Sequence, residues 1–194
     1  MPIAWMMAWD IVVRRQILWL PEPLCIIGRS PVSPVLPAHV RDRTRTARAA
    51  GAHLRHDRGS GTVFFSGCNL RCVFCQNHNI ALGKAGRVIT PEHLVKIFLQ
   101  LQEQGANNIN LVTPTHFLPQ IVIALQQAKN QGLSIPIVYN TGSYESPEAL
   151  RHLDGLVDIY LPDYKYIDPN MAAMLSGARD YPDVAFAAVA EMIR

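Results

Sequence analysis

Apolar and polar residues follow a regular pattern only in the second part of the chain. From Thr62 onward, short β-prone runs alternate with longer segments in which apolar residues recur at helical spacing. No such period runs through residues 21–60. The pattern predicts four strands, which cover residues 62–66, 109–112, 135–139 and 156–161.

Helix start and stop signals lie between these runs. Thr90-Pro91 and Ser146-Pro147 each place a capping hydroxyl before a proline at the first helical position. Glycines at 105 and 132 end the first two helices. We therefore expect helices that begin at residue 91, cover 119–130, begin at 147 and cover 184–193.

Strand and helix alternate four times, which predicts an α/β fold with a parallel sheet. This domain should cover residues 59–194. Residues 1–58 form an N-terminal extension to which we assign no fold. The extension holds all three tryptophans and six of the fourteen prolines, a composition that indicates a disordered or non-native segment.

Charge is unevenly spread along the chain. Residues 1–60 carry nine arginines and four acidic residues, a balance of +5, whereas residues 61–194 carry nine basic and eleven acidic residues, a balance of −2. A domain with that balance does not attract nucleic acid by bulk charge, so we expect no nucleic-acid partner. The apolar start is interrupted by Asp10, Arg14 and Arg15, and we expect neither a membrane span nor a signal peptide.

Cysteines cluster at one place. Cys68, Cys72 and Cys75 lie within eight residues, and the fourth cysteine, Cys25, lies in the extension. A secreted disulfide framework uses an even set dispersed along the chain, so the cluster indicates a metal or iron–sulfur site in a reducing cytoplasm. A [4Fe–4S] cluster usually takes four cysteines, and a loop with three leaves one iron open to a substrate or cofactor.

Polar residues lie at the C-terminal end of every predicted strand, where parallel α/β proteins bind their ligands. We therefore predict a single active-site face. For His116 two roles are open, a general acid or substrate contact and a histidine held by a hydrogen bond at a strand end. The four polar segments are residues 67–75, 113–116, 140–143 and 162–165.

The stretch GSGTVFFSGCNLRCVFCQNHNI resembles the cluster loop of radical S-adenosylmethionine (SAM) enzymes and is similar to the pyruvate formate-lyase activating-enzyme group. The likeness covers roughly residues 59–194. It implies a partial parallel (β/α) barrel, four strands long, in a chain that stops before the family's barrel is complete. An edge left open after the fourth strand would be exposed to pairing with another chain.

The resemblance also implies a chemistry. Cys68, Cys72 and Cys75 would bind three irons of a [4Fe–4S] cluster, and SAM would chelate the fourth. Reductive cleavage of SAM would give a 5′-deoxyadenosyl radical that abstracts hydrogen from a substrate. By position, Phe74 should lie beside the adenine. The other residues expected to line the SAM pocket are Thr113, Thr115, Asn140, Thr141, Asp163 and Lys165. Asp163 and Lys165 lie two apart on a strand and share a face, so a local ion pair is the alternative for these two.

The resemblance names classes of partner without fixing the substrate. A glycyl-radical enzyme is one implied substrate, and flavodoxin or ferredoxin is an implied electron donor. A different interpretation stays open, because Cys68, Cys72, Cys75 and His78 also match a short Cys₃His zinc site. A zinc-binding or truncated remnant of the family would hold its metal without turnover.

Overall fold

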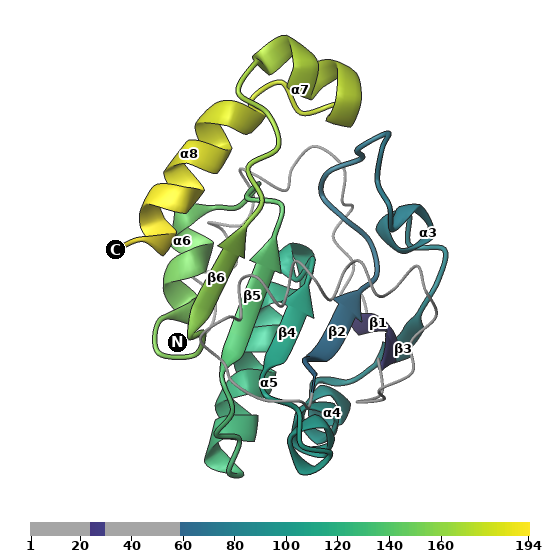
Figure 1. Cartoon of the computed structure of the whole chain (residues 1–194), viewed down its shortest axis with the longest axis vertical. Helices are drawn as coiled ribbons and strands as arrows, with labels where there is room; N and C mark the ends of the chain where they lie inside the picture. Colours follow the sequence, from purple (N-terminus) through teal and green to yellow (C-terminus); the bar gives the residue numbers. More distant parts are fainter. Residues whose placement is uncertain (1–23, 30–58) are drawn as a thin grey trace.

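The computed structural model describes residues 59–194 and the backbone of residues 24–29. It contains a six-stranded sheet in the order β3-β1-β2-β4-β5-β6 (Figure 1). Neighbouring strands β2, β4, β5 and β6 are parallel, as predicted, and the α/β class is confirmed. These four strands are β2 (Gly61–Phe65), β4 (Ile109–Val112), β5 (Ile137–Thr141) and β6 (Ile159–Pro162).

The sheet is open in the part of the chain that the structure describes, with β3 and β6 as its edges. Closure into a barrel therefore stays a prediction. Two strands were not predicted, β1 (Leu24–Arg29) and β3 (Arg87–Ile89), which pair with each other in antiparallel orientation. β1 belongs to the extension and pairs with β2 as well, while residues 1–23 and 30–58 lie outside the described residues.

Helices follow the predicted start signals closely. The hydroxyl of Thr90 accepts a hydrogen bond from the amide of His93 at the start of α4, and Ser146 caps α6 in the same way. No helix among the described residues is both long and apolar enough to cross a bilayer. The helices are α3 (His78–Ala81), α4 (Pro91–Glu103), α5 (Leu118–Asn130), α6 (Pro147–Leu150), α7 (Pro169–Ser176) and α8 (Tyr181–Met192). Short 3₁₀ turns cover η2 (Thr115–Phe117) and η3 (Arg151–Leu153).

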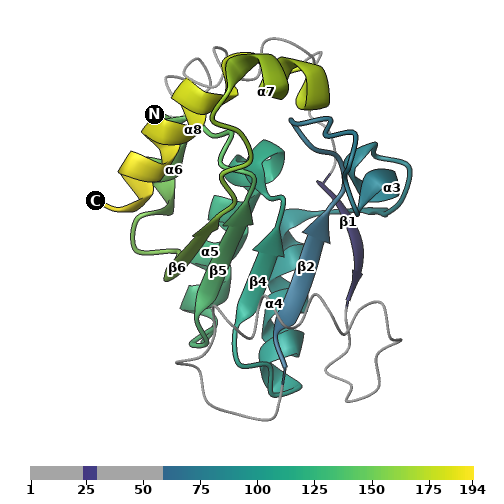
Figure 2. The same ribbon diagram turned by 45° about the horizontal axis from the view of Figure 1, so that its top comes forward.

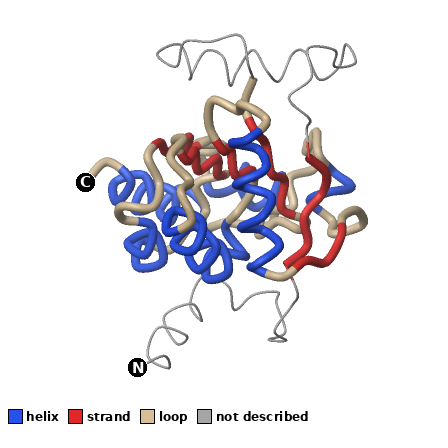
Figure 3. Tube along the Cα trace, turned by 90° about the horizontal axis from the view of Figure 1, so that it is seen from below, coloured by secondary structure: helices blue, strands red, loops and turns tan. Residues whose placement is uncertain are grey.

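The main core lies between the sheet and the helices that cover one of its faces (Figure 3). Alternate residues of the strands point into it, among them Phe65, Leu111 and Tyr139, none of which is exposed to solvent. Burial of each such side chain stabilises the fold by about 1.5–3 kcal/mol. The core therefore fixes the positions of the strand ends, from which the candidate site is built.

The sequence analysis did not predict two of the helices, the one-turn α3 and the longer α7. Asp168 caps α7 by accepting hydrogen bonds from the amides of Asn170 and Met171, and Pro169 occupies its first position. Gly177, with φ of 71°, ends it in the left-handed conformation that glycine adopts without strain. α7 and α8 continue from the loop after β6 and lie at the C-terminal end of the parallel strands (Figure 2).

Candidate functional site

The cysteine loop leaves β2 at a sharp turn. Gly67 adopts φ of 92°, and a Cβ atom at this position would lie 3.1 Å from Nε2 of His116. The Gly67 amide donates to the carbonyl of Ile80, and the Ser66 hydroxyl donates to the carbonyl of Ala85 at 2.6 Å. These bonds fix the direction in which the chain enters the loop.

All three cysteines belong to a second apolar cluster, which we call the rim cluster. Cys72 is buried, and Cys68 and Cys75 are half-buried against it. The cluster joins the cysteine loop to the segment after β6 and to α7 and α8 (Figure 2). Its buried members are Leu70, Cys72, Tyr166, Ala172, Ala178, Tyr181 and Ala185.

The thiol of Cys68 is strongly affected by this setting. Burial raises its pKa to about 11, against the hydrogen bond from the Leu70 amide, which lowers it, and the neighbouring thiols of Cys72 and Cys75 raise it further. The Cys68 thiol is therefore protonated at neutral pH in the metal-free chain. Metal binding at this position must displace that proton, which makes affinity depend on pH.

The donor set has the chemistry of an iron–sulfur site. Thiolates are the soft ligands that such clusters use, and three of them lie in one short loop inside one apolar cluster. As the side chains stand, no three His, Cys, Asp or Glu residues in the described ranges form a metal-holding group, so at least one of the thiols must turn toward the others to share a metal. His78, the fourth ligand of the alternative zinc site, is exposed on α3 and lies outside the rim cluster.

The ends of β5 and β6 are tied together by Tyr181 of α8. Its hydroxyl accepts from the amide of Lys165 at 2.8 Å and lies 2.9 Å from the carbonyl of Gly142 and 3.0 Å from that of Asp163. The ammonium of Lys165 donates to the carboxylate of Asp163. A Cβ atom on Gly142 would lie 3.2 Å from Leu70 and 3.3 Å from Lys165, so the glycine lets the cysteine loop and the end of β6 meet.

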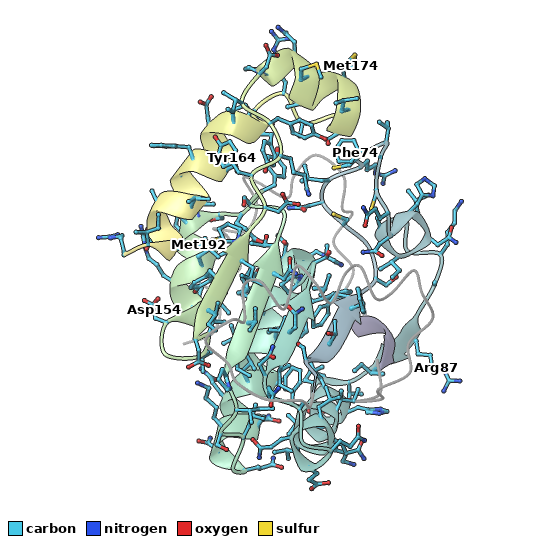
Figure 4. All side chains as sticks on the ribbon, viewed as in Figure 1. Phe74, Arg87, Asp154, Tyr164, Met174 and Met192 are labelled. Carbon is cyan, nitrogen blue, oxygen red and sulfur yellow. The ribbon has the colours of Figure 1, made fainter. Side chains whose placement is uncertain are left out.

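A second tether joins the cysteine loop to the segment after β5. The Asn69 side chain donates to the carbonyl of Tyr144 at 2.6 Å. The structure thus places the cysteine loop beside the end of β6, where Asp163 and Lys165 form an ion pair with each other. Phe74, in the loop, is 54% exposed, and its ring meets the edge of Tyr166 with centroids 6.1 Å apart (Figure 4).

Two of the predicted pocket residues turn instead toward a buried carboxylate that the sequence analysis missed. Thr115 donates to Oε1 of Glu145 at 2.7 Å, Tyr139 donates to the same atom at 3.3 Å, and Thr141 donates to it as well. Glu145 is 1% exposed, and burial raises its pKa to about 7, while the three hydroxyls lower it. Thr141 lies only four positions from Glu145, but Thr115 lies 30 positions away, so the full set of partners forms only in the folded chain.

Thr113 and Asn140 lie at neighbouring strand ends. The Thr113 amide donates to the carbonyl of Asn140 at 3.0 Å, and Thr113 adopts φ of 58°, a left-handed conformation uncommon for a β-branched residue. Asn140 and Thr141 are consecutive on β5, so they face opposite sides of the sheet. Thr141 faces the buried side with Tyr139, and Asn140 faces the other side.

His116 links the ends of β4 and β2. Its Nε2 lies 2.6 Å from the carbonyl of Ser66, which can only accept, so this nitrogen carries the proton. Burial lowers the pKa of His116, which keeps the ring neutral. Of the two roles left open by the sequence, the structure shows the hydrogen-bonded one. Nδ1 is buried and has no hydrogen-bond partner among the described residues.

Comparisons with known proteins identify the family of the chain. The family model described as the Radical SAM superfamily matches residues 62–193. An uncharacterized protein of Methanocaldococcus jannaschii, MJ0674, is 32% identical over 134 residues, which cover 64% of this chain and 38% of that protein. A pyruvate formate-lyase-activating enzyme of Clostridium pasteurianum is 30% identical over 123 residues, which cover 59% of this chain and 49% of the enzyme.

The chain thus spans less than half the length of the curated relatives that it matches. No solved structure matches it. The family match runs from β2, which leads into the cysteine loop, to the end of α8, and it includes every parallel strand and the whole rim cluster. The resemblance noted in the sequence is confirmed, and the chain belongs to the radical SAM superfamily.

Proposed function

We propose that the chain is the cluster- and SAM-binding part of a radical SAM enzyme. The observation that carries the proposal is the rim cluster, in which three thiols of one loop lie beside the ends of the parallel strands. Cys68, Cys72 and Cys75 would hold the [4Fe–4S] cluster. When bound, the cluster supplies the electron that cleaves SAM, and the radical released from SAM abstracts hydrogen from the substrate.

In this proposal the chain's own residues bind SAM, keep water from the thiols and hold the strand ends in position. SAM carries a carboxylate and an ammonium group, and the end of β6 offers Lys165 and Asp163 as complementary charges. The apolar side chains of the rim cluster exclude water from the thiols. Glu145 holds the ends of β4 and β5 together through Thr115 and Thr141, so we assign these two threonines a positioning role.

For the substrate we propose a glycyl-radical enzyme, with flavodoxin or ferredoxin as the electron donor. The likeness to a relative named pyruvate formate-lyase-activating enzyme supports this choice. The test is electron paramagnetic resonance of pyruvate formate-lyase incubated with the reconstituted chain and SAM. A glycyl radical signal is expected. SAM cleavage without that signal would contradict the substrate and leave the reaction class standing.

The reaction class is tested by anaerobic reconstitution with iron and sulfide. We expect cluster absorbance, iron on the chain, and 5′-deoxyadenosine when dithionite and SAM are added. Changing Cys68, Cys72 and Cys75 to Ala should abolish all three, whereas Cys25→Ala, outside the loop, should leave them intact. A colourless chain that binds zinc and no iron would instead support the Cys₃His alternative.

A further inference from the structure

Within the rim cluster, two hydroxyl groups form a relay of hydrogen bonds that ends on the sulfur of Cys72. The Ser176 hydroxyl donates to Sγ of Cys72 at 2.9 Å, and the Tyr166 hydroxyl lies 2.5 Å from Oγ of Ser176. All three side chains are buried: Tyr166 and Ser176 are 7% exposed and Cys72 is 9% exposed. Solvent therefore does not compete for these hydrogen bonds.

The number of protons on the two hydroxyls fixes which group donates in each of the two hydrogen bonds. A serine hydroxyl carries one proton, and Ser176 gives it to the sulfur of Cys72. Its oxygen is then an acceptor, so Tyr166 is the donor of the second bond. The relay runs from Tyr166 through Ser176 to Cys72, and it ends on one sulfur.

The backbone holds the end of α7 against the cysteine loop. Ser176 is the last residue of α7, and the amide of Val73 donates to the carbonyl of Leu175 at 2.9 Å. This bond sets Ser176 beside Cys72 independently of the hydroxyl itself. The other half of the relay is also fixed, because the Tyr166 ring packs edge-on against Tyr181, with centroids 5.2 Å apart.

The relay distinguishes Cys72 from the other two cysteines. In the described part of the chain, Cys72 is the cysteine whose sulfur accepts from a side-chain hydroxyl, whereas the sulfur of Cys68 accepts from the Leu70 amide at 3.4 Å. A hydrogen bond to a ligating thiolate withdraws electron density and stabilises the more negative, reduced cluster. Burial strengthens that effect.

We propose that Ser176, supported by Tyr166, is a positioning residue that raises the reduction potential of the cluster through Cys72. The inference rests on the proposed function, since it requires that Cys72 bind the cluster. It adds a residue of α7 and a residue of the β6–α7 segment, neither of which ligates iron, to the groups that decide how readily the cluster accepts an electron.

The test is a redox titration of the reconstituted chain, monitored by electron paramagnetic resonance. For Ser176→Ala we expect about a tenfold lower ratio of reduced to oxidised cluster at a fixed potential, which is 59 mV for one electron. Tyr166→Phe should shift the ratio in the same direction and by less. Ser176→Thr, which keeps the hydroxyl, should restore the wild-type ratio.

Tyr164→Phe is the matched control. Tyr164 is 41% exposed, and its hydroxyl donates to the carbonyl of Pro182, away from the sulfur, so its removal should leave the potential unchanged. Suppose that Ser176→Ala and Tyr166→Phe bind the same amount of iron as the wild-type chain and have the same cluster reduction potential. The inference is then wrong, and the proposed function stands. A wild-type chain that takes up no iron overturns both.

If Ser176→Ala does not fold, Tyr166→Phe decides alone. That variant lacks one oxygen atom and keeps the ring that packs against Tyr181. Loss of its hydroxyl leaves the Ser176 oxygen without a donor and weakens the bond to Cys72. An unchanged potential in a fully loaded Tyr166→Phe chain would then refute the relay.

Discussion

Glu145 is a buried carboxyl group beside the candidate site, and burial raises its pKa. Its pKa in the folded chain is about 7, against 4.5 for an ordinary glutamate. Between pH 4.5 and about pH 7, the Glu145 carboxyl is therefore protonated to a greater extent in the folded state than in the unfolded state. The contribution of Glu145 to stability is full below pH 4.5 and is lost as the pH rises toward about 7.

Glu145→Gln should remove this pH dependence. Glutamine stays neutral and can accept the same three hydroxyl protons on its oxygen. Between about pH 4 and about pH 8 the free energy of unfolding of the variant should rise relative to wild type by about 3 kcal/mol. Urea unfolding at a series of pH values measures this difference.

Glu148→Gln is the control for that measurement. Glu148 lies three positions away, and the Ser146 hydroxyl lowers its pKa, so its effect on stability has the opposite sign. This variant should lose a little stability relative to wild type as the pH rises through the range in which a glutamate ionises. Parallel pH profiles for wild type and Glu145→Gln would contradict the raised pKa.

Gly67 offers a second test at the scale of one residue, because its position is constrained in two ways. A side chain there meets both a positive φ and the ring of His116 at 3.1 Å. Gly83 also has a positive φ, of 69°, but nothing lies within 4 Å of its missing Cβ. Gly83→Ala therefore reports the backbone cost alone, roughly 1–2 kcal/mol.

Gly67→Ala should lower the free energy of unfolding by about 1 kcal/mol more than Gly83→Ala, because His116 is held by Ser66 and must give way. Urea unfolding of both variants gives the comparison. Equal losses in the two variants would mean that the contact between the start of the cysteine loop and His116 carries no energy.

Single residues differ in how far the sequence reveals them. Cys68, Cys72 and Cys75 could be predicted because their chemistry and spacing are local. Ser176 is 104 positions from the cysteine whose sulfur it contacts, so no window of sequence contains both. Glu145 is an intermediate case, because Thr141 lies four positions away but Thr115 lies 30 positions away and meets it only in the folded chain.

At the scale of elements, start signals were more informative than apolar periods. The Thr-Pro and Ser-Pro signals of α4 and α6 predicted both helices. Asp168-Pro169 is the same kind of signal and opens α7, whose small apolar residues give a weak period. β3 has three residues, and β1 comes from a stretch without alternation, so neither had a readable pattern.

The cap of α7 can be tested independently of any metal. Asp168→Ala removes the acceptor of two amide protons and should cost about 1 kcal/mol of stability. Hydrogen exchange should accelerate in the first turn of α7. Thr90→Ala, which removes the cap of α4, is the matched control and should accelerate exchange in α4 alone. Unchanged exchange in α7 would show that its packing on the rim cluster suffices.

For the whole molecule, the alternation of elements predicted the parallel order of four strands, because crossover connections leave few other arrangements. The same rule does not decide between an open sheet and a barrel, because both use parallel strands joined by crossovers. β6 is the edge strand of the sheet in the described residues. Its side chains are half-buried as far as Leu161, and Pro162 is exposed at its end.

An open edge of this kind pairs readily with another chain, and Pro162 blocks pairing only at its own position. We therefore expect this chain to self-associate through β6 as its concentration rises, measured by sedimentation velocity. Leu161→Lys places a charge on the edge and should weaken dimerisation about tenfold, or about 1.4 kcal/mol. Ile123→Lys adds the same charge to the exposed surface of α5 and should leave association unchanged. A sedimentation coefficient that is independent of concentration would show that β6 does not pair with a second chain. Equal effects of the two lysines would show that association responds to the added charge and not to a change at the edge of β6.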